Sequence, residues 1–193
     1  MAESRFDVAV LVGSLRKDSY NSKLARALDA IDHPRLQLSF VEIGQLPFFN
    51  QDDEPNPPQA WTDFRRRIAR ASAVLFVTAE YNRSTPAVLK NAIDVASRPS
   101  GQSVWNGKPG AIVSSSPSAI GGFGANHHLR QSMVFLNVPL LQQPEMYLGH
   151  VDKLIDAEGK IANDGTRDFL RKFLDAFAAW IGTVAGASSP ARS

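Results

Sequence analysis

The chain of 193 residues contains no cysteine and only four histidines. The absence of cysteine excludes thiol nucleophiles, disulfides, thiolate metal sites and dithiol redox motifs, so any redox activity must come from a bound cofactor. His127 and His128 are adjacent in the sequence and point to different sides of a helix, which does not suit shared metal coordination. We therefore expect no metal site.

A large charge excess and a long apolar run are also missing. Lys and Arg together number 21 against 19 for Asp and Glu, which gives a net charge of +2. The one basic cluster, Arg65, Arg66, Arg67 and Arg70, alternates with apolar residues at helical spacing, which favours a solvated helix face over a polyanion-binding patch. No apolar run approaches the roughly 20 residues that a membrane span needs. We expect a cytoplasmic protein with no nucleic-acid partner and no membrane insertion.

Strand and helix patterns alternate along the chain. The apolar run before Gly13 is continuous and rich in valine, as in a strand covered on both faces. After it, Leu24, Ala27, Leu28 and Ile31 recur at the spacing of a helix packed on a sheet. The patterns predict strands at residues 6–12, 36–42, 73–78, 110–114 and 140–146, and helices at about 21–31, 58–71, 86–97, 123–136 and 166–184.

Five such units predict an α/β fold of the flavodoxin-like type, a three-layer sandwich around a five-stranded parallel sheet in the order 2-1-3-4-5. The length suits one domain, which we place at residues 1–185, followed by a flexible tail at residues 186–193. In this order the carboxyl ends of strands one and three are neighbours. Ligands of open α/β sheets bind in the crevice beyond those ends.

Phosphate-binding groups crowd the loop from Gly13 to Asn21, whose sequence is Gly-Ser-Leu-Arg-Lys-Asp-Ser-Tyr-Asn. The loop ends at the start of a helix, where unpaired N–H groups and the helix dipole stabilise an anion. Its single glycine excludes the Gly-x-Gly-x-x-Gly dinucleotide motif, and it has no Gly-Lys-Ser/Thr ending. We expect a terminal phosphate monoester here. An alternative stays open, in which Ser19 only caps the helix and Arg16 is solvated.

Two further polar loops follow predicted strands. Residues 78–86 follow the third strand, which neighbours the first in this order, so this loop and the Gly13–Asn21 loop should flank one cleft. Residues 114–122 follow the fourth strand and end in Gly121 and Gly122, which would let the backbone approach a flat ligand closely. Together the three loops predict one binding site for a small molecule.

Three ordered motifs in these loops resemble those of the NAD(P)H-dependent FMN reductase family, above all its bacterial chromate and quinone reductases. They are Gly13-Ser14-Leu15-Arg16-x-x-Ser19-x-Asn21, Glu80-Tyr81-Asn82-x-Ser84-x-Pro86 continuing into Leu89-Lys90-Asn91-Ala92-Ile93-Asp94, and Gly121-Gly122 after a serine-rich strand end. The resemblance extends from residue 6 to about residue 182. It implies an FMN enzyme in which NADPH or NADH delivers a hydride and a quinone, or chromate, an azo dye or free flavin, then takes the electrons by a ping-pong mechanism.

The resemblance also implies roles toward FMN for three groups of residues, with the flavin rather than a side chain carrying the chemistry. The phosphate would be held by Ser14, Arg16, Ser19, Asn21 and the amide of Tyr20. The isoalloxazine and ribityl chain would be lined, largely through the backbone, by Ala79, Glu80, Tyr81, Asn82 and Ser84. The pyrimidine edge would be approached by Ser115 and the amides near Gly121 and Gly122. The resemblance further implies a homodimer or homotetramer, and helix 123–136, with Met133, Val134 and Phe135 nearly all round it, has apolar surface to spare for a partner.

Two positions depart from the family pattern: Ala79 stands where many relatives have proline, and Val95 where many have tryptophan. Two other functions stay open. A flavodoxin-like electron carrier binds FMN in this fold, although such carriers tend to be acidic and use a Thr-Gly phosphate loop. A flavin-binding regulatory module would keep FMN as a structural ligand without rapid NAD(P)H oxidation.

Overall fold

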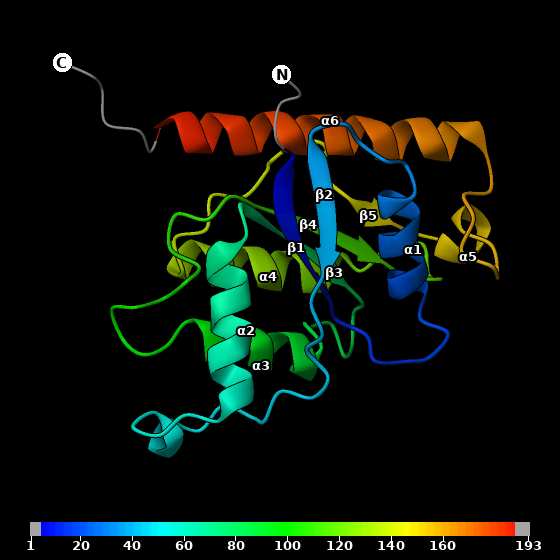
Figure 1. Ribbon diagram of the computed structural model, residues 1–193. Coiled ribbons are helices and arrows are strands. Elements are labelled where there is room, and N and C mark those ends of the chain that lie inside the picture. The colour runs from blue at the N-terminus through cyan, green and yellow to red at the C-terminus, as the bar shows by residue number, and fades with distance from the viewer. Residues whose placement is uncertain (1–4, 188–193) are drawn as a thin grey trace.

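A five-stranded parallel sheet lies between two layers of helices in the computed structural model, which describes residues 5–187 (Figure 1). The strand order is β2-β1-β3-β4-β5, so the expected flavodoxin-like topology is confirmed. In chain order the elements are β1 (Phe6–Val12), α1 (Tyr20–Asp29), β2 (Leu36–Phe40), the 3-10 helix η1 (Gln51–Asp53), α2 (Gln59–Arg70), β3 (Ala73–Thr78), α3 (Ala87–Ala96), β4 (Gly110–Ser115), α4 (Phe123–Phe135), β5 (Tyr147–Leu148), α5 (Val151–Leu154) and α6 (Asp164–Ala187).

The central strands are buried on both faces, which explains their continuous apolar sequences. Side chains alternate along a strand, so Val8 and Val10 of β1 pack on one side of the sheet and Ala9 and Leu11 on the other. Every residue of β3 and β4 is buried. A strand with neither face exposed to solvent has apolar residues at successive positions of its sequence.

The two faces of the sheet have separate cores. Helices α1 and α6 cover one face, and α6, which runs across the whole top of the sheet in Figure 1, adds Phe173, Phe177 and Ile181 to that core. Helices α2, α3 and α4 cover the other face, where Trp61 and Trp105 are among the largest buried side chains. Because helices cover both faces, a ligand can reach the sheet only at its edges, and open α/β sheets bind ligands at the carboxyl ends of the strands.

The predicted fifth strand, residues 140–146, is wrong. Leu140 forms one bridge with Gly110, and regular pairing with β4 begins only at Tyr147. Between them, Pro144 has no N–H to donate, and the sequence Gln-Gln-Pro-Glu at residues 142–145 interrupts the ladder. The chain therefore follows the edge of β4 in two short contacts.

Other differences concern the ends of elements. The second strand ends at Phe40 instead of residue 42, and the last helix spans Asp164–Ala187 instead of residues 166–184. The short helices η1 and α5 lie in segments for which no helix was expected. Residues 186 and 187 of the expected tail are helical, and residues 188–193 lie outside the described residues.

Candidate functional site

Three loops at the carboxyl ends of β1, β3 and β4 surround a cavity of about 160 Å³. It is lined by Ser14, Arg16, Ser19, Tyr20, Asn21, Ala79, Glu80, Tyr81, Ser115, Ser116 and Pro117. The structure thus brings together the residues expected to bind phosphate and the start of each other loop. Of the expected site residues, Asn82, Ser84, Gly121 and Gly122 do not line this cavity, whereas Ser116 and Pro117 were not expected.

The first loop presents the amino end of α1 to the cavity. Ser19 caps this helix, because its Oγ accepts a hydrogen bond from the Ser22 amide at 3.3 Å. Arg16 is exposed at the rim, and its Nη2 donates to the Asp18 carbonyl at 2.6 Å. The capping role of Ser19 leaves its hydroxyl proton available as a donor. The helix dipole and the guanidinium both favour a bound anion here.

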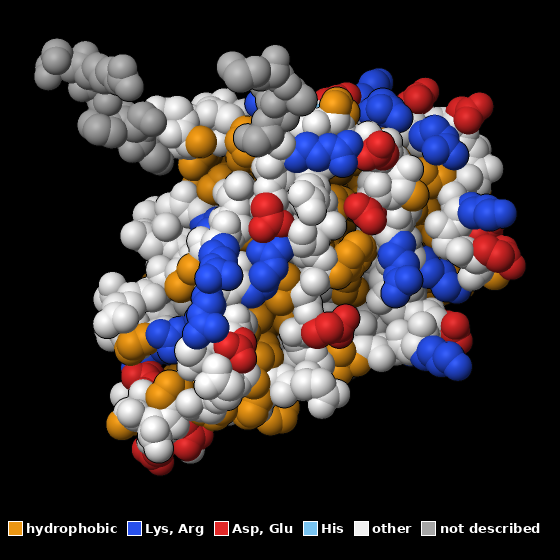
Figure 2. Space-filling view, viewed as in Figure 1, with side chains coloured by type: hydrophobic (Ala, Val, Ile, Leu, Met, Phe, Trp, Pro, Cys, Tyr) orange, Lys and Arg blue, Asp and Glu red, His pale blue; other side chains and the backbone are white. Residues whose placement is uncertain are grey.

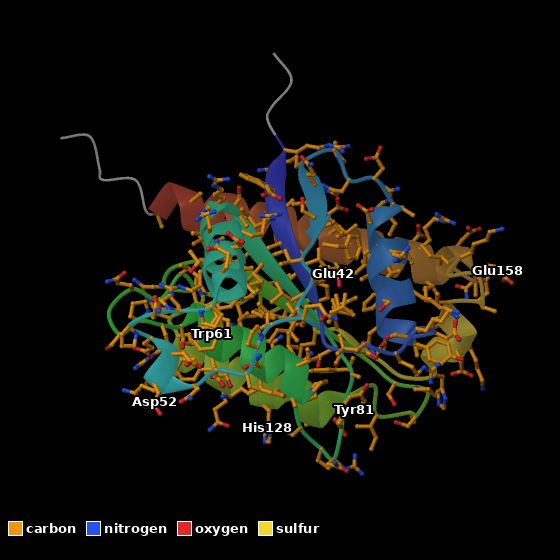
Figure 3. The ribbon with its side chains drawn as sticks, turned by 60° about the horizontal axis from the view of Figure 1, so that its bottom comes forward. Glu42, Asp52, Trp61, Tyr81, His128 and Glu158 are labelled. Carbon is orange, nitrogen blue, oxygen red and sulfur yellow. The ribbon has the colours of Figure 1, made fainter. Side chains whose placement is uncertain are left out.

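A tight turn in the second loop explains why Asn82 and Ser84 lie away from the cavity. Tyr81 and Ser84 exchange two backbone hydrogen bonds of 3.0 Å each. The two residues between them, Asn82 and Arg83, have φ angles of 51° and 63°, the left-handed conformation of a type I′ turn. The Ser84 hydroxyl lies 2.9 Å from His128 Nδ1 of α4 (Figure 3 labels Tyr81 and His128 along this edge).

Glu80 ties the second loop to the start of α4. Its Oε2 accepts a hydrogen bond from the Ala125 amide at 3.1 Å, and its Oε1 accepts one from Arg83 Nη1 at 3.2 Å. The side chain is only 13% exposed. Gly124 permits this approach, because a Cβ there would lie 2.9 Å from Glu80 Oε2. The carboxylate therefore satisfies an orphan N–H of the helix amino end from outside the helix.

The third loop lies directly on the end of β5. Gly121 has a φ of +63°, and a Cβ there would come within 2.6 Å of the Tyr147 carbonyl carbon. A Cβ on Gly149 would in turn collide with the carbonyl of Ala119. Gly122, at φ +77°, begins α4 in the left-handed conformation. These glycines shape the loop, and Ser115 to Pro117 form the wall that faces the cavity.

Side-chain hydrogen bonds join the loops across the cavity. Ser115 Oγ donates to Asn21 Oδ1 at 3.0 Å, and both residues are buried. Ser14 Oγ lies 3.4 Å from Tyr81 Oη on the opposite rim, where Tyr81 is 50% exposed. The first loop is therefore bonded to each of the other two.

An aromatic cluster borders the third loop. The Tyr147 hydroxyl donates to Glu145 Oε1 at 2.8 Å and lies 3.1 Å from His127 Nε2. Burial, reinforced by Glu145, raises the pKa of Tyr147. The ring of Phe123 packs against His127 with centroids 4.2 Å apart. His127 and His128 thus contact different neighbours, as the sequence predicted.

Within residues 5–187, no group of three or more His, Asp or Glu side chains is arranged to hold a metal ion. No helix in the same part of the chain is long and apolar enough to cross a membrane.

Comparison with known proteins gives matches along most of the chain. The family model described as NADPH-dependent FMN reductase matches residues 6–153. A quinone reductase of Pseudomonas putida is 59% identical over 177 residues, which cover 91% of this chain and 95% of that protein. A 2-hydroxy-1,4-benzoquinone reductase of Burkholderia sp is 49% identical over 174 residues, or 90% and 95% of the two chains.

A solved structure is similar as well. The flavoenzyme NAD(P)H:(acceptor) oxidoreductase FerB from Paracoccus denitrificans superposes with a TM-score of 0.87 at 40% identity, covering 92% of this chain and 98% of that one. The apo form of the NADH:FMN oxidoreductase EMOB, with a TM-score of 0.67 at 16% identity, shows the shared fold alone.

Proposed function

The chain belongs to the NADPH-dependent FMN reductase family, and from that premise we propose that it binds FMN among the three loops and reduces quinones with electrons from NADPH or NADH. The balanced reaction is NAD(P)H + H⁺ + quinone → NAD(P)⁺ + hydroquinone. The observation that carries the proposal is the convergence of Arg16, the amino end of α1 and two further polar loops on one cavity. The similar quinone reductases support the choice of acceptor.

The donors of the cavity fit the phosphate of FMN. The first turn of α1 offers backbone N–H groups, Ser14 and Ser19 offer hydroxyl donors, and Arg16 offers a charged donor that can turn from the Asp18 carbonyl toward an anion. Among residues 5–187, no acidic side chain other than Glu80 lines the cavity. The charge of Glu80 is directed toward Arg83 and the Ala125 amide, so it opposes an anion only weakly.

The other loops fit the rest of the cofactor by position. Glu80 holds the second loop against α4, which fixes the backbone at Ala79 to Tyr81 beside the cavity. Ser115 to Pro117 form the facing wall. When bound, FMN supplies the hydride acceptance and donation that links a nicotinamide to a quinone. The protein contributes binding, orientation and an electrostatic environment.

The residue assignments toward FMN stay predictions, and so does a cytoplasmic location. We also expect a homodimer or homotetramer, because Val134 and Phe135 at the end of α4 are 80% and 89% exposed and would gain from a partner surface. The electron carrier and the regulatory module are not favoured, since the similar proteins are named as reductases.

Anaerobic spectroscopy on the purified protein tests the proposal. The FMN-loaded protein should lose its visible flavin absorbance on addition of NADPH or NADH, and a quinone should then restore it. A protein that takes up no FMN would refute the proposal. A flavin that stays oxidised in the presence of both nicotinamides would instead support the electron carrier or the binding module.

A further inference from the structure

A second pocket, of about 420 Å³, adjoins the proposed FMN site and shares Arg16 and Tyr81 with it. Its wall is mainly apolar and includes Leu15, Leu46, Phe48, Pro86 and Val88. Figure 2 shows apolar side chains gathered along the lower edge of the molecule, where the connection between β2 and α2 runs. Volume and lining both fall in the range typical of small-molecule sites.

The structure holds Phe48 in place on this wall. The carbonyl of Pro47 accepts hydrogen bonds from Trp61 Nε1 at 2.9 Å and from Asn91 Nδ2 at 3.1 Å. The amide of Phe49 donates to Asn91 Oδ1 at 2.8 Å, and the Phe49 ring packs against Trp61 with centroids 5.5 Å apart. Both neighbours of Phe48 are thus fixed by buried side chains. The residue Phe48 is nevertheless 76% exposed.

The other side of the pocket is formed by the first loop. Leu15, which is 62% exposed, packs over Gly44, where an added Cβ would lie 2.8 Å from Leu15 Cδ2. Tyr81 stands between the pocket and the FMN site, with its hydroxyl 3.4 Å from Ser14 Oγ. Arg16 is the only charged residue that the described part of the chain contributes to the lining, and it lies at the shared boundary. The remainder of the pocket favours an uncharged, apolar group.

We propose that this pocket binds the apolar side chain of a quinone acceptor while the quinone ring lies at the FMN site, and that Phe48 is a specificity-determining residue. The inference rests on the proposed function. Continuity through Arg16 and Tyr81 places one molecule within reach of both spaces. The concave shape and volume suit an alkyl or prenyl chain better than a flat protein surface.

Two quinones that differ only in one decyl chain test the inference: a dimethoxy-methyl-1,4-benzoquinone with the chain and the same quinone without it. Each methylene moved from water onto apolar surface improves binding about fourfold. We expect wild-type kcat/KM to be at least tenfold higher for the decyl quinone. Phe48→Ser should lower that ratio at least fivefold and leave the value for the quinone without a chain within twofold.

Phe169→Ser is the matched control, because Phe169 is an exposed phenylalanine on α6 that does not line the pocket. It should leave the ratio of the two kcat/KM values unchanged. A binding readout that needs no turnover is saturation-transfer NMR with the dimethyl ether of the decyl hydroquinone. Transfer to the decyl protons should be lost in Phe48→Ser and kept in Phe169→Ser.

The outcomes separate this inference from the proposed function. If the FMN-loaded wild type reduces neither quinone, the proposed function fails. If it reduces both and Phe48→Ser has the wild-type ratio, only the pocket assignment is overturned. If sedimentation shows that Phe48→Ser alone changes the association state, the pocket is an interface between copies of the chain, and the assignment is again overturned.

Discussion

Replacement of Gly121 by alanine should destabilise the fold and weaken FMN binding, for two separable reasons. The φ of +63° costs an L-residue about 1–2 kcal/mol. The new Cβ would lie 2.6 Å from the Tyr147 carbonyl carbon and 2.8 Å from the Gly149 amide nitrogen, and both are backbone atoms that cannot rotate away. Such overpacking costs about 1–3 kcal/mol more. The expected loss of unfolding free energy is therefore about 2–5 kcal/mol.

Gly101 provides the matched control. Its φ is +79°, and nothing lies within 4 Å of a Cβ added there. Gly101→Ala should therefore cost only the backbone strain, about 1–2 kcal/mol. Both changes reduce the flexibility of the unfolded chain equally, so this effect cancels in the comparison. The difference between the two variants measures the collision of the third loop with β5.

Urea unfolding of the FMN-free proteins, followed by circular dichroism, gives both free energies. Titration with FMN, followed by quenching of flavin fluorescence, then measures the affinity of each variant for FMN. Gly121→Ala should lose at least tenfold in affinity, because the loop that carries Ser115 to Pro117 must move off β5 to make room. Gly101→Ala should keep wild-type affinity. Equal destabilisation by both variants would show that the loop shifts freely and would refute the reasoning.

Three further predictions concern single side chains. Arg16→Ala should weaken FMN binding by about 1.5–3 kcal/mol, because a charged hydrogen bond is lost. Lys17→Ala removes the same charge from the next exposed position and should have a much smaller effect in the same fluorescence titration. Equal losses would contradict a specific phosphate contact. Glu80→Ala should lower both FMN affinity and thermal stability, because it leaves the Ala125 amide unpaired. Glu80→Gln keeps an acceptor oxygen and should recover most of the stability in a melting experiment. A melting temperature of Glu80→Ala equal to that of wild type would contradict a stabilising role for this hydrogen bond. Burial lowers the pKa of Lys108 from its ordinary 10.5. Between the lowered pKa and 10.5 the unfolded chain binds more protons than the folded one, so the free energy of unfolding should rise with pH across that window. Urea unfolding at several pH values should show a smaller rise for Lys108→Met, and a rise equal to that of wild type would exclude Lys108 as its cause.

The sequence predicts those parts of the fold that depend on long, regular patterns. The runs ending at Val12 and Thr78 are continuous and apolar, and each becomes a strand with the expected bounds. The strand β5 has only two residues, Tyr147 and Leu148, which is too short for a periodic pattern to predict it. Pairing with β4 fixes the place of β5. The sequence instead predicts a strand that begins at residues 140 and 141, because these leucines are apolar; they are buried in the two cores of the sheet without forming a strand.

The candidate site shows the same division. Arg16 and Ser19, whose residue types suggest anion binding in a loop before a helix, both line the cavity. Asn82 does not, because a type I′ turn with arginine at its second central position carries no clear sequence signal. The contact of Glu80 with Ala125 joins residues 45 positions apart and arises only when β3 and β4 are neighbours. Residue type thus predicts which groups are available, and the topology decides which of them meet.

The position of α6 has a consequence for synthesis of the chain. The three loops around the cavity end at residue 122, yet α1 alone covers its face of the sheet until α6 adds Phe173 and Phe177. A nascent chain that ends before Asp164 exposes this apolar face to water, which invites aggregation or chaperone binding. The loops of the candidate site are therefore synthesised before the helix that completes one of the two cores of the sheet.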